Sequence, residues 1–412
     1  MRQLTLTEGS PAETYDLTTK EAEAIAGAEL GEVARLPGAS DWSISAGRKI
    51  GVARIGDLQL TVRPKIPIDR LIFLMSYARD PKFWRDQSVL LGVDSDITEA
   101  LAHAFGFHAS KALDQGLLQG YRTTDDSLSV VRGRIRVGDQ ISRHYGRGLP
   151  LEITYDDFTV DVAENQVLLT AALLLLRMPG VRPTSRDILQ RLRLKLAGVS
   201  PVPRGQRTPG WVASRLNTRY QPALRLADLI LAGNSFEQNV GDIQVTGFIV
   251  DMWKAYEDFV CVALREALRA HGGRVALQSK LHLDEGEQVE LRPDFLWTAP
   301  YHQQVVADAK YKAEKPSGFP QADLYQLLAY CTVLRIPIGH LIYAKGNEKP
   351  ASHVVRNAGV VIRCHTLDLE QSPRQVLGQI AAIATELVRG RPKWPSECTA
   401  GTLAFTDQGR TS

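Results

Sequence analysis

The sequence predicts an α/β (α+β) protein in two parts, a mixed α/β N-terminal region and a C-terminal domain built on one mixed sheet. Two observations carry this prediction. Residues 43–66 alternate apolar and polar positions on either side of a Gly-Asp turn signal, as a β-hairpin does. The patterns over residues 252–390 predict a helix, three strands, a helix, two strands and a helix, which is the order of a sheet flanked by helices.

Length and composition are those of an ordinary folded protein. The chain has 412 residues, of which 44% are hydrophobic and 23% charged, and this excludes a largely disordered chain or a fibrous rod and indicates two or three domains. No segment approaches the ~18 uninterrupted apolar residues of a membrane span, and the first residues lack the pattern of a secretory signal. The net charge is only +3, so any nucleic-acid surface must be a local patch.

The cysteines indicate a reducing compartment. Cys261, Cys331, Cys364 and Cys398 are far apart and never form a C-x-x-C pair. This spacing argues against a disulfide framework or a zinc ribbon and favours buried thiols. We therefore expect a cytoplasmic protein.

The N-terminal region is expected to span residues 1–240. Its first 40 residues are polar, and an acidic, alanine-rich stretch within them predicts one short helix. Further helices are predicted at 70–78, 96–118, 184–197 and 217–233, and a strand followed by a long helix at 149–178. The most basic stretch of this half, 132–147, is either a contact surface for DNA or a partner, or a solvated β-hairpin.

The second domain is expected to span 248–390, with a tail at 391–412. The pattern of apolar and polar residues changes near 235–248, which marks the boundary. An amphipathic helix is predicted at 252–273 and ends at two glycines. Strands are predicted at 274–283, 289–297, 304–312, 338–346 and 359–369, and helices at 321–335 and 372–390.

Three side chains of the second and third of these strands form a candidate active site. Asp294 follows a proline in the second strand, while Asp308 and Lys310 share one face of the third, because strand side chains alternate. A short loop makes the two strands antiparallel neighbours, which brings the carboxylates together. Converging carboxylates repel each other unless a cation lies between them, and oxygen ligands suit Mg²⁺. Lys310 would then orient or help deprotonate an attacking water.

Written out, R-P-D-x13-D-A-K is the signature of PD-(D/E)xK nucleases. In strands of a matching element order, it predicts a restriction-endonuclease-like domain with a metal-dependent phosphodiesterase site. The Ala309 carbonyl is expected to join the two aspartates as a metal ligand. The alternative is a pair of solvated hairpin carboxylates with a surface lysine.

Two further charged residues agree with such a site. Glu257 lies in the helix before the sheet, where this nuclease superfamily often places a glutamate near the metal; the alternative is an exposed helix carboxylate. Lys312, together with Lys315, extends the basic edge beyond Lys310 and would bind phosphate without regard to sequence, unless it lies in a solvated loop.

Gln326 and Tyr330 are four residues apart on the helix after the third strand, on a different side from Leu324, Leu328 and Cys331. They resemble the Q-x-x-x-Y element of RecB-like nucleases, which lies beside the active site and contacts DNA. The alternative is a packing tyrosine with a surface glutamine.

Several segments together resemble McrC, the nuclease subunit of McrBC-type modification-dependent restriction systems. They are spread over about residues 48–345 and comprise RPD…DAKYK, DLYQLLAY, GVARIGDLQLTVRPKI, VRGRIRV, YDDFTVDVAENQVLLTAAL and RYQPALRLADLIL. The resemblance thus covers most of the chain.

The resemblance implies both an activity and partners. The N-terminal part would dock into a ring of an McrB-like AAA+ GTPase and stimulate it, and the C-terminal domain would cut double-stranded DNA at modified cytosine sites with Mg²⁺. Asp294, Asp308 and Lys310 match the family's catalytic triad. The chain has no G-x-x-x-x-G-K-[ST] phosphate loop, so the partner would supply the GTPase. Two other functions stay open: a stand-alone RecB-like DNA nuclease, and a non-catalytic activator of an AAA+ ring.

Overall fold

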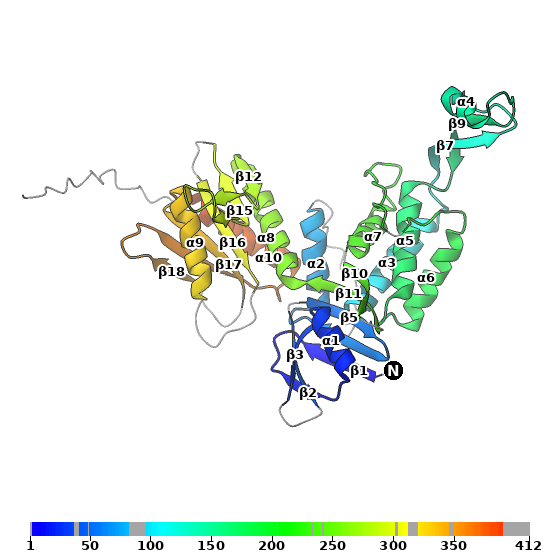
Figure 1. Ribbon diagram of the computed structural model, residues 1–412. Coiled ribbons are helices and arrows are strands. Elements are labelled where there is room, and N and C mark those ends of the chain that lie inside the picture. The colour runs from blue at the N-terminus through cyan, green and yellow to red at the C-terminus, as the bar shows by residue number, and fades with distance from the viewer. Residues whose placement is uncertain are drawn as a thin grey trace, which may run out of the picture. The chain divides into compact units, whose positions relative to one another are not determined.

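The structure is a computed structural model that describes residues 2–36, 41–47, 49–81, 96–203, 205–232, 234–240, 243–300, 304–311, 320–345 and 350–389. It divides into two compact units, Met1–Phe259 and Val260–Ser412. The fold is mixed α/β, as predicted, with helices α1–α10 and several sheets in the described residues (Figure 1). No described helix is long and apolar enough to span a membrane. The expected domain limits at 240 and 248 stay a prediction, and the expected tail lies outside the described residues.

The first unit is built on a five-stranded sheet in the order β1-β6-β5-β11-β10. Its strands are β1 (Arg2–Thr7), β5 (Lys49–Ile55), β6 (Leu58–Arg63), β10 (Asn234–Val240) and β11 (Ile243–Asp251). The predicted β5–β6 hairpin is confirmed. Ile55 pairs with Leu58 across a two-residue turn, and Gly56 supplies the positive φ of +57° that such a turn requires.

The short helix predicted in the first 40 residues is confirmed, but the strands around it were not predicted. β1 pairs in parallel with β6, and a second, three-stranded sheet follows. This region contains β2 (Glu13–Tyr15), α1 (Thr19–Gly27), β3 (Gly31–Arg35) and β4 (Trp42–Ala46). Residues 235–240 and 243–248, from the stretch where the sequence pattern changes, belong to β10 and β11, and β11 is paired with β5. These strands depend on partners far away in the sequence, which local patterns do not reveal.

The remaining helices of this unit agree with the sequence within a few residues. They are α2 (Ile68–Arg79), α3 (Ile97–Leu113), α5 (Ala163–Arg177), α6 (Pro183–Lys195) and α7 (Gln221–Ala232). α3 and α5 each pack against both α6 and α7, so these four helices form one bundle.

A narrow sheet extends away from this bundle and carries a short helix at its far end (Figure 1). We call residues 120–159 the arm; it consists of β7 (Gly120–Leu128), β8 (Arg134–Ile135), α4 (Val137–Arg143) and β9 (Leu151–Thr159). The basic stretch 132–147 is therefore the tip of the arm rather than a simple β-hairpin.

The second unit is a six-stranded mixed sheet in the order β12-β15-β16-β17-β19-β18. Its strands are β12 (Arg274–Leu277), β15 (Phe295–Thr298), β16 (Gln304–Lys310), β17 (Ile338–Ala344), β18 (Ala351–Val354) and β19 (Val361–Leu367). Its helices are α9 (Gln321–Leu334), α10 (Pro373–Arg389) and the short 3₁₀ helix η1 (Arg269–His271), while α8 (Met252–Leu268) crosses the division between the units. The order of elements is the one the sequence predicts, with β18 added.

Two predicted strands of this unit are interrupted, which corrects the ranges 274–283 and 289–297. Gln278 has a left-handed φ of +49° and ends β12, and Pro293 has no N–H to donate to a sheet. The separated pieces β13 (Leu281–His282) and β14 (Glu290–Leu291) pair with each other as a small ribbon.

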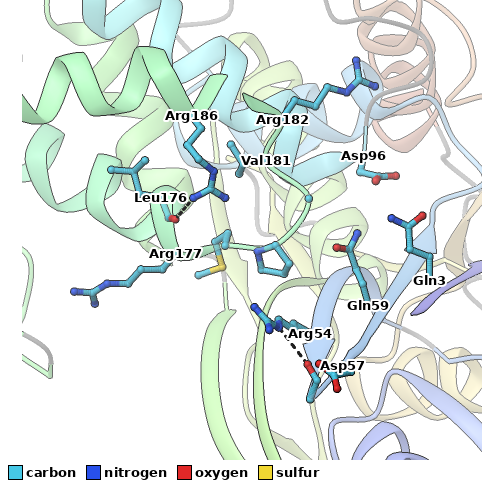
Figure 2. A pocket seen from close by; sticks show the side chains of 14 residues that line it. Gln3, Arg54, Asp57, Gln59, Asp96, Leu176, Arg177, Val181, Arg182 and Arg186 are labelled. Atoms are coloured by element: carbon cyan, nitrogen blue, oxygen red, sulfur yellow. Dashed lines mark hydrogen bonds between the residues drawn. The ribbon is translucent and has the colours of Figure 1, made fainter. Parts of the chain in front are cut away.

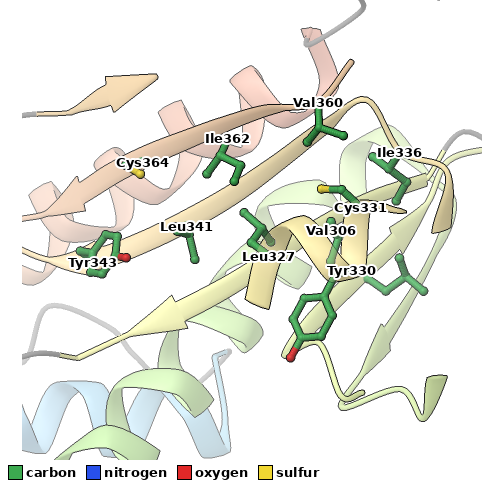
Figure 3. Close-up of a cluster of buried hydrophobic side chains, with 11 residues drawn as sticks. Val306, Leu327, Tyr330, Cys331, Ile336, Leu341, Tyr343, Val360, Ile362 and Cys364 are labelled. Atoms are coloured by element: carbon green, nitrogen blue, oxygen red, sulfur yellow. The ribbon is translucent and has the colours of Figure 1, made fainter. Parts of the chain in front are cut away.

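α9 is held on the sheet by a buried apolar cluster (Figure 3). Gly339 of β17 allows the close approach, because a Cβ there would lie 2.6 Å from Cys331 Sγ and 2.8 Å from a Leu327 methyl carbon. Tyr330 belongs to this cluster and is 1% exposed, so placing it away from Leu324, Leu328 and Cys331 was wrong. Cys261, Cys331 and Cys364 are buried thiols, as expected, and Cys398 lies outside the described residues.

Candidate active site

The candidate site lies where β15 and β16 separate. Pairing between these antiparallel strands ends at Phe295 and Ala307, and the next residues are Asp294 and Asp308. β16 continues to Lys310 with β17 as its partner. Beyond Ala307, the edge of β16 on this side is therefore open to side chains instead of a neighbouring strand.

Asp294 and Asp308 meet at this opening. Asp308 Oδ1 accepts a hydrogen bond from the Asp294 backbone N over 3.4 Å, and Asp294 Oδ2 accepts one from the Ala309 backbone N over 2.9 Å. The two aspartates are only 7% and 2% exposed, so they are not the solvated carboxylates of the alternative interpretation. Burial, and then repulsion from Asp294, raises the pKa of Asp308 to about 7. Ionisation of Asp308 beside Asp294 is therefore costly.

Lys310 lies on the same face as Asp308, as the alternation of the strand predicts. Its Nζ is 2.6 Å from Asp308 Oδ2 and donates a hydrogen bond to Gln326 Oε1 over 3.0 Å. Burial acts to lower the pKa of Lys310, but the surrounding carboxylates, led by Asp308, outweigh it and leave that pKa raised. Lys310 is therefore held as an ammonium between β16 and α9.

Gln326 and Tyr330 are connected to the site from α9. Gln326 Nε2 donates to the Tyr330 hydroxyl over 2.8 Å, and this hydroxyl donates to the Arg292 carbonyl over 3.1 Å. The Tyr330 ring packs in the core while its hydroxyl fixes the backbone two residues before Asp294. Gln326 is exposed, and its contact with DNA stays a prediction.

Two polar residues near the site were missed by the sequence analysis. Gln278 donates from its backbone N to the Asp294 carbonyl over 3.2 Å and from Nε2 to Asp294 Oδ1 over 2.8 Å. Asp323 of α9 is buried, accepts a hydrogen bond from the Tyr343 hydroxyl over 3.0 Å, and helps to raise the pKa of Lys310. No local pattern predicts that Gln278 belongs to the site. Asp323 lies within the DLYQLLAY motif but was not identified there as a site residue.

The expected metal ligands fit a magnesium ion better than a transition metal. The described residues contain no group of three or more His, Cys, Asp or Glu side chains arranged to hold a metal. Asp294, Asp308 and the Ala309 carbonyl instead form a small oxygen set; since the Ala309 N–H points to Asp294, the carbonyl of the same strand residue faces the same edge. Mg²⁺ is commonly bound by one or two carboxylates and completed by water and substrate phosphate. A cation here would also offset the repulsion between the aspartates.

The other two predicted site residues are Glu257 and Lys312. Glu257 lies in α8 on the first unit's side of the division, and Lys312 lies outside the described residues. Their assigned roles stay predictions.

Several basic side chains of the 132–147 stretch form ion pairs with acidic side chains of the arm itself. Glu152 of β9 is 2% exposed; its carboxylate contacts Arg136 at 2.9 Å, His144 at 3.0 Å and Arg143 at 3.4 Å. The hydrogen bond from His144, and more weakly the two arginines, lower the pKa of Glu152. Arg132 pairs with Asp157 over 2.8 Å. Most of this positive charge therefore stabilises the arm and is not a free surface for DNA.

Fold and site together define a class: a two-unit mixed α/β protein with a buried Asp–Asp–Lys site at an opening in a mixed sheet. The chain belongs to the family described as McrBC 5-methylcytosine restriction system component, whose model matches residues 44–344. The resemblance in the sequence is thereby confirmed at the level of the McrBC family.

A solved structure shows a similar fold. A chain of the refined half-complex from a tetradecameric assembly of Thermococcus gammatolerans McrB AAA+ hexamers with bound McrC superposes with a TM-score of 0.57 at 16% identity, covering 93% of this chain and 99% of that chain. A chain of the cryo-EM structure of the McrBC complex of the same organism gives a TM-score of 0.40 at 18% identity, covering 65% and 88%. No curated protein matches.

Proposed function

We propose that this chain is the DNA endonuclease subunit of an McrBC-like modification-dependent restriction system. In this proposal the second unit is a PD-(D/E)xK nuclease that hydrolyses phosphodiesters with Mg²⁺, and the first unit docks on an McrB-like AAA+ GTPase and stimulates it. The observation that carries the nuclease assignment is the meeting of Asp294, Asp308 and Lys310 at the opening between β15 and β16. Membership of the McrBC family supports the assignment of the restriction system.

The chemistry follows from these residues. Asp294, Asp308 and the Ala309 carbonyl would hold Mg²⁺, which supplies a Lewis acid and a bound water of lowered pKa. The Lys310 ammonium, fixed by Asp308 and Gln326, is placed to orient the attacking water and to stabilise negative charge on the phosphate. Tyr330 and Gln278 would keep the backbone and carboxylate of Asp294 in place during the reaction.

Plasmid cleavage tests the proposal directly. Wild-type protein and Asp308→Ala are incubated with Mg²⁺ and plasmid carrying 5-methylcytosine, with and without the McrB-like partner and GTP. We expect cleavage in the complete mixture alone, and its loss in the variant while GTPase stimulation is retained. Cleavage by the chain alone would instead identify a stand-alone nuclease, and stimulation without any cleavage by the wild type a non-catalytic activator.

The arm is the part of the first unit best suited to contact the AAA+ ring. Half of the large apolar side chains that are exposed in the described residues lie in it. They include Val130, Val131, Val137, Ile141, Tyr145 and Leu149 near its tip. Since exposed apolar side chains gathered in one region are typical of protein interaction sites, we assign this tip to the partner ring. A solved assembly of McrB AAA+ hexamers with bound McrC, to which this chain is similar in fold, supports that partner.

Surface variants of the tip test this assignment. Ile141→Ser combined with Tyr145→Ser changes two side chains that are 57% and 86% exposed, so the fold should be unaffected. We expect the stimulated GTPase rate to fall at least about tenfold, as loss of interface anchors does. Val354→Ser, at 77% exposure on β18, is the matched control and should leave stimulation unchanged. Equal effects of the tip and control variants would contradict docking through the arm.

A further inference from the structure

A polar cleft of about 1010 Å³ lies in the first unit, away from the arm (Figure 2). One wall is the β5–β6 turn at Gly56 and Asp57, and the opposite wall is the loop between α5 and α6, residues 178–182. Every residue that lines it belongs to the first unit, so the cleft shares no residue with the candidate nuclease site.

The cleft is lined by more positively than negatively charged side chains. Four arginines line it, namely Arg54, Arg177, Arg182 and Arg186. Arg54 donates to the Gly56 carbonyl over 3.2 Å and Arg186 to the Leu176 carbonyl over 2.7 Å, so both groups bond to neutral acceptors. Arg177 has no ion-pair partner among the described residues. Of the two lining aspartates, Asp96 already lies 3.5 Å from Arg63.

The arrangement of these guanidinium groups favours an extended polyanion over a single phosphate. Arg177, at the end of α5, and Arg182, before α6, extend in opposite directions, while Arg54 lies across the cleft from Arg186 (Figure 2). The start of α6 is not a phosphate site, because Glu99 already accepts hydrogen bonds from the Arg182 backbone N and the Ser185 hydroxyl, both over 2.7 Å. Dispersed arginines suit successive phosphates of a strand, each of which accepts a planar fork of N–H groups.

We propose that this cleft binds the phosphate backbone of DNA without reading its sequence. Its residues precede those of the candidate cleavage site by more than one hundred positions in the sequence. The inference rests on the proposed function in taking DNA as the substrate. A protein partner is the less favoured occupant, since the cleft contains four arginines, and contacts to the DNA backbone are made largely by arginine and lysine.

The test is a binding measurement in which no cleavage takes place. The affinity of the full chain for a fluorescein-labelled, unmodified DNA duplex is measured by anisotropy in EDTA over a series of salt concentrations. Arg54→Ala combined with Arg177→Ala removes two cleft charges. We expect roughly tenfold weaker binding and a salt slope reduced by about two, one for each lost phosphate contact.

Arg191→Ala combined with Arg193→Ala is the matched control, because both residues are exposed on α6 and do not line the cleft. It should leave the affinity and the slope unchanged. Equal losses in both double variants, or no loss in the cleft variant, would overturn the proposal. Competition by free GTP at matched ionic strength would assign a nucleotide site instead, and a loss of partner-ring binding with unchanged DNA affinity would assign a protein contact; either result rejects a DNA backbone site.

This outcome is independent of the nuclease assignment. A chain that cuts no DNA under any condition, but whose cleft variant binds DNA more weakly, would contradict the proposed nuclease and leave the cleft in place. Normal cleavage by the wild type, together with unchanged DNA affinity in the cleft variant, would contradict the cleft proposal and leave the nuclease assignment in place.

Discussion

Gln278 and Asp294 are joined by two hydrogen bonds, one from the Gln278 backbone N to the Asp294 carbonyl and one from Gln278 Nε2 to Asp294 Oδ1. With Ala309 N on Oδ2, both carboxylate oxygens of Asp294 have a fixed N–H donor. Gln278 adopts a φ of +49°, which residues other than glycine rarely do and which often marks a functional site. The backbone of Gln278 is thus held in an unfavourable conformation where its amide reaches Asp294.

The first prediction concerns this amide. Gln278→Met keeps the length of the side chain but removes the donor, so the Asp294 carboxylate loses one of the two N–H groups that fix its orientation. We expect the apparent affinity for Mg²⁺ in the cleavage assay to fall about 10–100-fold, as it does when the partner of a metal ligand is lost. The measurement is the cleavage rate against Mg²⁺ concentration.

Gln278→Asn distinguishes the effect of the side-chain hydrogen bond from that of the backbone conformation. Asparagine tolerates a left-handed φ better than glutamine, but its shorter side chain does not reach Asp294. It should resemble Gln278→Met in its Mg²⁺ dependence and exceed it in thermal stability. Wild-type Mg²⁺ dependence in the methionine variant would show that Gln278 does not position Asp294.

A second prediction follows from the buried repulsion between Asp294 and Asp308. At pH 8, above the pKa of about 7 of Asp308, the Asp308 carboxylate is ionised beside Asp294 in the metal-free protein. A cation that binds the folded state alone stabilises it, so Mg²⁺ should raise the Tm of the wild type measured in an EDTA-treated sample. Asp308→Asn should abolish this shift, since it removes one ligand and the repulsion together. An equal Mg²⁺ shift in the variant would place the ion elsewhere.

The sequence predicted this site because its central features are local. Strand alternation places Asp308 beside Lys310, and a short connection brings Asp294 opposite Asp308; the register of β15 and β16 agrees with both. The role of Gln278 was not predicted, since this residue lies sixteen positions before Asp294 and reaches it only because its own backbone is left-handed. β1 was missed for a related reason, as its partner β6 lies more than fifty residues away. Contacts that depend on tertiary structure leave little trace in local patterns.

A third prediction tests whether the seating of α9 matters for the site. Gly339→Ala would place a Cβ within van der Waals distance of Cys331 and Leu327 and push α9 away from β17. Overpacking of this kind costs about 1–3 kcal/mol of unfolding free energy. Because Gln326 of α9 holds Lys310, we also expect cleavage to fall more than the lost stability explains. Urea denaturation and cleavage rates measure the two effects.

Gly378→Ala is the control for this change, because a Cβ at that position of α10 meets nothing within 4 Å. It should keep wild-type stability or exceed it, since alanine favours helix over glycine. If Gly339→Ala leaves both stability and cleavage unchanged, α9 tolerates displacement and does not position Lys310 through Gln326.

The last prediction concerns the pH dependence of the arm. The pKa of Glu152 is lowered in the folded state, so its carboxylate stabilises the arm above the unfolded pKa of about 4.5, and this stabilisation is lost as the pH falls through the lower folded value. Hydrogen exchange, corrected for the intrinsic rate at each pH, should show protection of β8 and α4 falling in acid. In Glu152→Gln the protection should already be low at neutral pH, and docking on the partner ring should weaken with it. Asp157→Asn removes a more exposed pair, with Arg132, and should have a smaller effect. Protection that is unchanged in Glu152→Gln would mean that strand pairing alone, without the Glu152 contacts, keeps the arm folded.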